Sequence, residues 1–347
     1  MRLLRTSCRA VSGASAAALA GALLLGAAPA AAEPDPFNPE KLPTPVLYNY
    51  GENETTRSGA MGGALRALGN GTSALFLNPA AMTMTRVYHI EAQAQLSPEA
   101  GRQLYTANVV DSVTGRLAGA ASITGGFVDP DATHRSLIDV RAALAFPVSD
   151  RFSIGLGGRW LKLNQEALTA PFKLDDISGG LRDPAGDPTS RFSFVNALTF
   201  DVGITARLGD NIYLAATGQN LTYPNDALLP TTVGGGVGYG NANLSIEADG
   251  IADLTTWGKP TARLMLGGEY LVADHVPIRL GYRFDQGAKL HTLSAGLGYI
   301  APEFSIEGTV KRSLSDPGVT TMIFSVAYFL ESSGLTRAQS NAESQPF

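Results

Sequence analysis

The chain has 347 residues, a formal net charge of −5, 16% charged residues and 39 glycines. An acidic chain lacks the basic face that phosphate binding needs, so nucleic acid is excluded as an expected partner. The only cysteine is Cys8, which excludes a disulfide framework and a thiolate metal site.

Residues 1–32 are predicted to be a secretory signal peptide. A basic start carries Arg2, Arg5 and Arg9, an apolar stretch follows at 16–28, and Ala30-Ala31-Ala32 offers a cleavage site. A membrane-anchoring helix is the alternative, and it is disfavoured because the apolar run is short and rich in alanine. Cleavage of the signal peptide would remove its three arginines and leave 23 basic and 31 acidic residues, a net charge of −8.

Residues 33–85 form an N-terminal extension without strand alternation. The stretch 33–46 is rich in proline, whereas 47–85 is rich in glycine and contains a possible short helix at 60–68. After residue 32, no apolar run approaches the roughly 20 residues that a membrane-spanning helix needs.

From residue 86 the pattern changes to strict alternation of apolar and polar residues, which is typical of strands with two different faces. In 87–96, for example, Tyr88, Ile90 and Ala92 share one face, opposite His89 and Glu91. The pattern predicts fourteen strands, at 87–96, 103–111, 117–127, 138–146, 152–160, 200–208, 211–221, 231–239, 242–249, 261–270, 276–284, 291–299, 304–311 and 320–330. Most have about the 9–11 residues that a tilted membrane strand requires.

Short and long connections alternate between these strands, and the longest is predicted at 161–199. Membrane barrels have short periplasmic turns and longer external loops, whereas a soluble β-sandwich has no reason to alternate in this way. We therefore expect an all-β fold: a fourteen-stranded antiparallel transmembrane β-barrel over 86–330, followed by a polar tail at 331–347. This fold predicts a multi-pass protein of the bacterial outer membrane, in contact with its lipid.

Charged side chains occupy the face of the strands opposite the apolar one. A basic side chain facing lipid costs about 2–4 kcal/mol at the midplane, so these residues are predicted to line the lumen. They are Asp139, Arg141, Arg159, Asp201, Arg207, Arg263, Glu269, Arg279, Arg283, Glu307 and Lys311. A structural network of paired charges and a substrate-selective ring both fit this placement.

A motif of small residues precedes the first predicted strand: Gly59-Ala60-Met61-Gly62-Gly63-Ala64, then Ser73 to Met82 with Asn78-Pro79-Ala80 inside it. The motif resembles the FadL/TodX family of outer-membrane long-chain fatty-acid transporters and the related PorV-type barrels. The resemblance implies an N-terminal hatch inside a fourteen-stranded barrel. It also implies that Asn78, Pro79 and Ala80 are hatch residues whose movement opens a path. The alternative is that they simply begin the first strand.

Two glycine-rich sites stand out within the predicted strands. The run Gly234 to Gly240 is followed by another strand rather than a helix, so it lacks the geometry of a nucleotide-binding loop. We expect a thin strand there, where the hatch or another backbone approaches the wall. Gly125-Gly126 is a candidate for a bulge or kink.

No pattern of catalytic or metal-binding residues is recognisable. The histidines His89, His134, His275 and His291 are scattered without the spacing of metal ligands, and no Ser–His pair is singled out. We therefore expect no cofactor, no metal and no enzymatic activity, with a membrane hydrolase as a remote alternative.

The sequence favours passive uptake of hydrophobic or amphipathic, fatty-acid-like small molecules past the hatch. The alternative is a PorV-like barrel that binds exported protein partners at its external loops and does not transport. A continuous apolar pocket between 47–85 and the inner wall would favour uptake. A sealed, charge-packed lumen with an exposed groove among the external loops would favour the partner-binding role. Apolar residues for external capture are few, with Pro171, Phe172 and Leu174 as candidates in 161–199.

Overall fold

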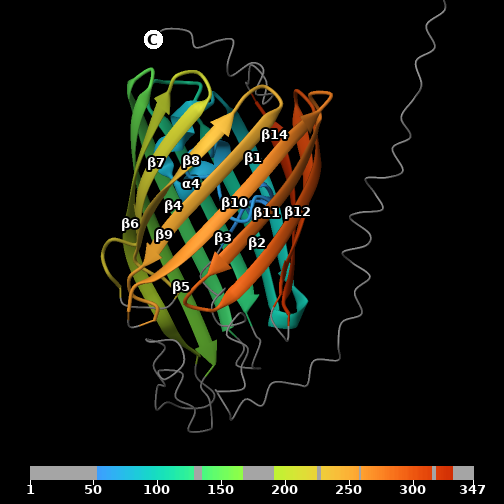
Figure 1. The fold of residues 1–347 in the computed structure, drawn as a ribbon. Helices are drawn as coiled ribbons and strands as arrows, with labels where there is room; N and C mark the ends of the chain where they lie inside the picture. The colour runs from blue at the N-terminus through green and yellow to red at the C-terminus, as the bar shows by residue number, and fades with distance from the viewer. Residues whose placement is uncertain are drawn as a thin grey trace, which may run out of the picture. The chain divides into compact units, whose positions relative to one another are not determined.

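The structure is a computed structural model that describes residues 53–128, 135–166, 191–224, 228–257, 259–314 and 318–330. The predicted signal peptide, the whole Pro-rich stretch 33–46, Pro171, Phe172, Leu174 and the predicted tail 331–347 lie outside these ranges. Fourteen antiparallel strands form a closed barrel in which each strand pairs with its neighbours in sequence and the last strand pairs with the first (Figure 1).

The fourteen strands have the following bounds: β1 (Tyr88–Ser97), β2 (Arg102–Asp111), β3 (Ala118–Val128), β4 (Arg135–Ser149), β5 (Phe152–Glu166), β6 (Arg191–Leu208), β7 (Ile212–Gln219), β8 (Thr232–Gly240), β9 (Leu244–Asp253), β10 (Thr261–Val272), β11 (Val276–Asp285), β12 (Leu290–Ile300), β13 (Phe304–Ser313) and β14 (Thr320–Phe329). Each matches one predicted strand. The expected fold class is therefore confirmed.

The two faces of the wall differ as the alternation predicts. Outward-facing side chains are large and apolar, and they remain exposed in the isolated chain, for example Leu280 at 59%, Leu264 at 55% and Ile306 at 54%. Inward-facing side chains are mostly buried and often polar. A closed wall satisfies the backbone hydrogen bonds of all its strands, which a lipid environment requires. The exposed apolar band is therefore the surface that we expect to face lipid.

Aromatic side chains mark both ends of this band, as in other membrane barrels. Those near the short turns are Phe146, Tyr239, Tyr270, Tyr299, Phe304 and Tyr328, and those nearer the long connections are Tyr105, Phe127, Trp160 and Tyr282. All ten are outward-facing and exposed. They place the two membrane boundaries at the two ends of the barrel.

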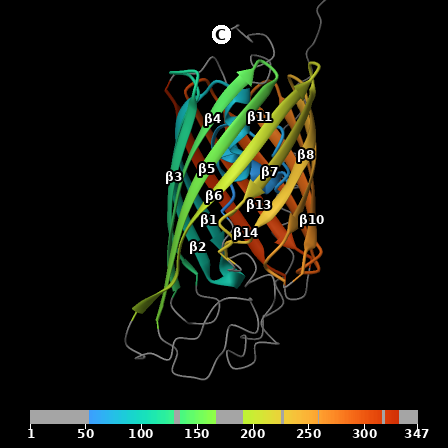
Figure 2. The same ribbon diagram turned by 90° about the vertical axis from the view of Figure 1, so that its left-hand side faces the viewer.

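Strands β4, β5 and β6 are longer than predicted, with 15, 15 and 18 residues. The predicted loop 161–199 was too long, because 161–166 and 191–199 belong to β5 and β6. The prediction failed because the alternation inverts there: Leu161 and Leu163 face inward and are buried, while Lys162 faces outward. Polar residues face outward where the wall meets water rather than lipid. Figure 2 shows β4, β5 and β6 side by side along one side of the barrel.

The pairing of β3 with β2 and β4 runs without a register shift through Gly125 and Gly126, so there is no bulge there, and the alternative of a kink stays a prediction. The irregularities occur between Pro147 and Ser149 in β4 and at Leu163/Asn164 in β5. Proline cannot donate to the ladder, which explains the first position.

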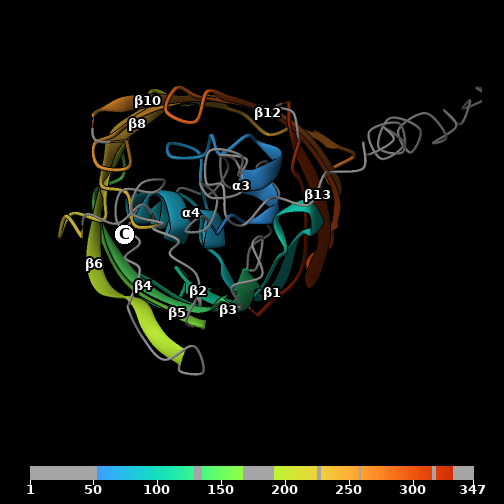
Figure 3. The ribbon, with the colours of Figure 1, turned by 90° about the horizontal axis from the view of Figure 1, so that it is seen from below.

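Residues Asn53–Thr85, here called the plug, lie inside the barrel (Figure 3). The plug contains α3 (Thr56–Ala60), α4 (Gly71–Leu77) and the 3₁₀ helix η3 (Pro79–Met84). The predicted helix at 60–68 is wrong. A capping box between Thr55 and Ser58 starts α3 earlier, and Gly62 and Gly63, with φ of 68° and 88°, follow its end with a left-handed backbone.

A short 3₁₀ helix, η4 (Pro98–Ala100), connects β1 to β2. Among the described residues, no helix is both long enough and apolar enough to cross a membrane.

A lipid-facing wall predicts that an added charge is penalised according to depth. Leu280→Arg, in the middle of β11, is expected to lower the free energy of unfolding in lipid vesicles by about 2–4 kcal/mol. The matched change Val272→Arg, on the same face beside the β10–β11 turn, is expected to cost at most about 1 kcal/mol. Equal costs in denaturant titrations would contradict the membrane placement.

Candidate functional site

The plug presses against the wall at inward-facing glycines. A Cβ atom added at Gly296, Gly267 or Gly281 would clash with Ala60, Met61 or Gly62 of the plug. On the far side, Gly155 and Gly203 make room for Ala80 and Asn78 in the same way. The side chain of Leu68 lies over Gly238 and Gly240, which confirms that the run Gly234 to Gly240 is a thin strand approached by the plug. Glycine is needed at these positions because the plug leaves no space for a side chain.

Two carboxylates of β9 hold the centre of the plug through its backbone. Asp249 accepts hydrogen bonds from the amides of Leu65 and Arg66 at 3.1 and 3.2 Å. Glu247 accepts from the amides of Ala67 and Leu68 at 2.6 and 2.8 Å. The Arg66 guanidinium also pairs with Asp249 at 3.1 Å. Four consecutive amides of a turn are therefore satisfied by the wall rather than by water.

A chain of charges joins α3 to β10, β11 and β13. Arg57 makes two hydrogen bonds of 3.0 Å to Glu269. Glu269 also accepts from Arg279 at 2.6 Å, and Arg279 in turn pairs with Glu307. Because the plug supplies Arg57 and the wall the other three, this chain anchors α3 to one side of the lumen.

A second group of charges lies near Glu54. Lys311 pairs with Glu54, and Arg283 lies 3.6 Å from the same carboxylate. Arg263 pairs with Asp253 at 2.5 Å and with Asp285 at 3.1 Å. Strands β9 to β13 thus hold the plug mainly by charge.

The opposite wall, β4 to β6, has three inward-facing layers from the long-connection end to the short-turn end. The first layer is apolar and includes Leu137, Leu161 and Leu163. The full cluster is Leu104, Val128, Leu137, Leu161, Leu163, Val195, Leu228 and Leu229. Leu228 and Leu229 come from the β7–β8 connection and are 2% and 0% exposed, so this connection covers the layer from inside.

The second layer is charged. Asp139 accepts from Arg141 at 3.1 Å and from Arg159 at 2.7 Å. The guanidinium of Arg141 lies 4.8 Å from the ring centroid of Phe76 in the plug, a cation–π contact. Asp201 accepts from the backbone amide of Asn220 at 2.7 Å. This layer therefore contacts both the plug and the β7–β8 connection.

The third layer consists of small residues that face the second half of the plug. Ala118, Ala143 and Ala145 of the wall form one buried apolar cluster with Ala74, Leu75, Ala81 and Met82 of the plug. Few charges hold the plug on this side.

Asn78 makes the main polar tie to this wall. Its amide donates to Thr205 Oγ1 at 2.8 Å and to the carbonyl of Arg66 at 2.7 Å, and its oxygen caps η3 by accepting from Ala80. Ser153 of β5 donates to the carbonyl of Ala80 at 2.8 Å. The structure thus places Asn78, Pro79 and Ala80 inside the barrel against β5 and β6, and not at the start of β1.

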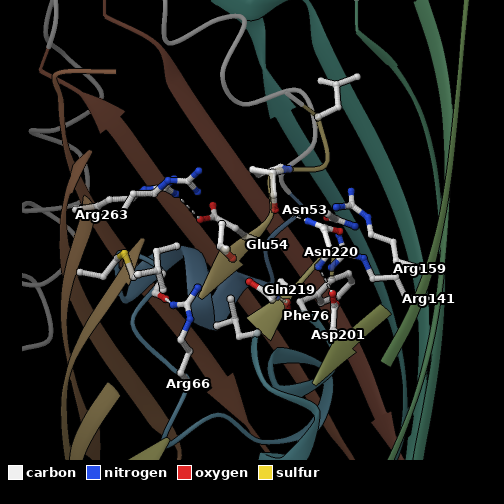
Figure 4. A pocket seen from close by; sticks show the side chains of 18 residues that line it. Asn53, Glu54, Arg66, Phe76, Arg141, Arg159, Asp201, Gln219, Asn220 and Arg263 are labelled. Atoms are coloured by element: carbon white, nitrogen blue, oxygen red, sulfur yellow. Dashed lines mark hydrogen bonds and ion pairs between the residues drawn. The ribbon is translucent and has the colours of Figure 1, made fainter. Parts of the chain in front are cut away.

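A cavity of about 100 Å³ lies between the plug, the charged layer and the β7–β8 connection (Figure 4). Its lining includes Asn53, Glu54, Arg66, Phe76, Leu77, Arg141, Arg159, Asp201, Gln219, Asn220, Leu228, Pro230, Ile251, Arg263, Met265 and Arg283. Polar and apolar side chains both contribute. The structure therefore differs from the continuous apolar pocket that the uptake hypothesis anticipates.

Ten of the eleven lumen charges singled out from the sequence have the placement described above, in two clusters on opposite walls. Arg207 is the exception: it lies by the β6–β7 turn, where it donates to the carbonyl of Asp210 and lies over the ring of Tyr213. The sequence reasoning missed the plug charges Glu54, Arg57 and Arg66 and the wall acids Glu247, Asp249, Asp253 and Asp285. A signal existed for β9, where Glu247, Asp249 and Asp253 follow the inward period of two.

Among the residues that the structure describes, no group of three or more His, Cys, Asp or Glu side chains is arranged to hold a metal ion.

The sequence matches no family profile and no curated protein. Solved structures that match its fold include the CymD monoaromatic hydrocarbon channel, the toluene transporter TbuX of Ralstonia pickettii and a FadL homologue of Pseudomonas aeruginosa. Their TM-scores are 0.61, 0.58 and 0.56, at 14%, 14% and 16% sequence identity. The matches cover 81%, 82% and 80% of this chain and 97%, 100% and 98% of the others.

The barrel has the fold of the FadL-type channels. At these identities the match establishes the fold alone, and it confirms the resemblance read from the motif at 59–82 at that level. Together with the exposed apolar band, it makes the chain a transmembrane barrel of the outer-membrane type. Two of the three matched structures are described as a channel or a transporter.

Removal of one charge from the anchoring chain is expected to destabilise the protein. Glu269→Gln leaves Arg57 and Arg279 buried with weakened partners, so the free energy of unfolding should fall by about 3–5 kcal/mol. The control Glu303→Gln, on the exposed β12–β13 turn, should change it by at most about 0.5 kcal/mol. Denaturant unfolding of the two variants in vesicles provides the measurement, and equal stability would refute the anchoring role.

Proposed function

We propose that the chain is a passive channel of the bacterial outer membrane for hydrophobic or amphipathic small molecules, with the plug as its hatch. The unequal attachment of the plug is the observation that carries this proposal. Buried charges fix the plug to β9 to β13, whereas small apolar residues and Asn78 provide its contact with β4 to β6. The proposal contains no chemical step and needs no cofactor.

A path along β4 to β6 follows from this difference. A solute would enter the apolar layer after displacement of Leu228 and Leu229, pass the charged layer, and continue between the alanines of the wall and η3. Movement of the plug away from β5 and β6 breaks few polar contacts, because those described there centre on Asn78 and Ser153. Movement away from β9 to β13 would separate buried ion pairs, which is strongly unfavourable.

The proposal is supported by what two proteins of the same fold are described as carrying. CymD is described as a monoaromatic hydrocarbon channel and TbuX as a toluene transporter. A ligand of similar size suits a lumen in which the described cavity holds about 100 Å³. Long-chain fatty acids would need the apolar layer of β4 to β6 to accommodate their tails.

A second candidate function is a PorV-like barrel that binds exported proteins. The anchoring charges favour it, because a lumen crossed by paired charges and closed by a plug suits a barrel that does not conduct. The two candidates differ in a simple phenotype: loss of the chain should impair uptake in the first case and protein secretion in the second.

Weakening the tie between Asn78 and the wall is expected to increase uptake. Asn78→Ala removes the bond to Thr205 of the wall, worth about 1 kcal/mol, so the open state should gain roughly five-fold in population. Labelled toluene and labelled long-chain fatty acids are supplied to cells that lack the gene and carry either the wild-type chain or the variant. The matched control is Thr83→Ala, whose lost hydroxyl bonds to Ala80 within the plug.

Each result of this experiment separates the alternatives. Wild-type uptake equal to that of cells without the chain would overturn transport. A change in the secreted proteins of such cells would then favour partner binding. If the wild-type chain supports uptake and Asn78→Ala leaves that uptake unchanged, the proposed channel stands and the role of Asn78 in the hatch is overturned.

A further inference from the structure

The cavity between the plug, the charged layer and the β7–β8 connection is lined by more positive than negative side chains. Among the described residues, five arginines line it: Arg66, Arg141, Arg159, Arg263 and Arg283. Two acidic residues line it, Glu54 and Asp201. Figure 4 shows that the arginines come from both sides, with Arg141 and Arg159 on one side of Glu54 and Arg263 on the other.

The remaining acids that balance these arginines are not part of the described lining. Asp139 pairs with Arg141 and Arg159, and Asp249 pairs with Arg66. Asp253 and Asp285 pair with Arg263. These carboxylates hold four of the five arginines from outside the described lining, whereas Arg283 lies 3.6 Å from Glu54 within it. With five arginines and two acids, the described lining still carries more positive than negative charge. Such a preorganised site favours an anion because its groups need no reorganisation when the anion arrives.

The same cavity has an apolar part. Phe76 and Leu77 of the plug line it, together with Leu228, Pro230, Ile251 and Met265. Leu228 also belongs to the apolar layer of β4 to β6, so the apolar part continues toward the long-connection end. The cavity volume of about 100 Å³ is close to the size of one aromatic ring, since an engineered cavity of roughly 150 Å³ binds benzene.

We infer that this cavity is a binding site for a compact aromatic carboxylate, with the carboxylate facing the arginines and the ring against Phe76 and Leu228. The inference rests on the proposed channel and specifies its ligand. It predicts preference for an anion over a neutral molecule of the same shape. Neither charge excess nor apolar lining alone would select this class, because inorganic anions lack the ring and hydrocarbons lack the charge.

Binding to the purified full-length chain in detergent tests the inference. The probes are sodium benzoate and benzyl alcohol, which differ chiefly in charge, titrated by calorimetry. Benzoate should bind at least about ten-fold more tightly, since a charge-assisted hydrogen bond contributes roughly 1.5–3 kcal/mol. Equal affinity for the two probes would overturn the inference, as would the absence of benzoate binding.

Three variants test whether the preference for benzoate over benzyl alcohol arises in this cavity. Arg283→Gln should weaken benzoate binding about ten-fold and leave benzyl alcohol unchanged, whereas Arg283→Lys, which retains the charge, should restore most of the benzoate affinity. Asp201→Asn removes a negative charge from the lining and should strengthen benzoate binding. Heat-dependent mobility in gels confirms that each barrel is folded, and Arg141→Gln replaces Arg283→Gln if that variant fails. Equal benzoate affinity in all folded variants would overturn the assignment.

The uptake experiment with labelled toluene distinguishes failure of this inference from failure of the proposed function. Normal uptake of toluene without benzoate binding would overturn the ligand class and leave the channel standing. Selective benzoate binding without uptake of any probe would overturn the channel and leave the site standing.

Discussion

The pairing of β14 with β1 is the constraint on which the rest of the structure depends. Their register runs from His89 opposite Phe329 to Leu96 opposite Met322, so the wall has no open edge. In lipid each unpaired backbone group would be costly, and closure removes that cost for all fourteen strands at once. Closure also encloses a lumen, and every second side chain must then be accommodated within it.

The lumen is filled by two kinds of contact that complement each other. Where the plug approaches the wall by backbone, as at Gly267 and Gly281, the wall has no side chains. Where the wall carries long side chains, such as Glu269 and Glu307, the plug supplies a charge of the opposite sign or a polar group. Each buried charge described in these chains has at least one partner, which is the usual condition for retaining charges away from water.

Sequence reasoning reached the fold because the alternation of side chains is imposed by lipid on one side and the lumen on the other. It placed all fourteen strands and the inward direction of Asp139, Arg141 and Glu269. It failed at Leu161 and Leu163, where water replaces lipid and the rule reverses. The partners of the charges could not be predicted, since pairs such as Arg57 with Glu269 depend on how the plug folds inside the barrel. The gating role of the plug and the signal peptide remain predictions.

The anchors of the plug have a consequence for assembly. Glu54 and Arg57 lie near the beginning of the described chain, yet their partners Lys311 and Glu269 follow 257 and 212 residues later. Contacts between segments so distant in sequence form slowly, because a long loop must close first. The contacts that anchor Glu54 and Arg57 can therefore form only after the last third of the chain, which carries Glu269 and Lys311, is in place.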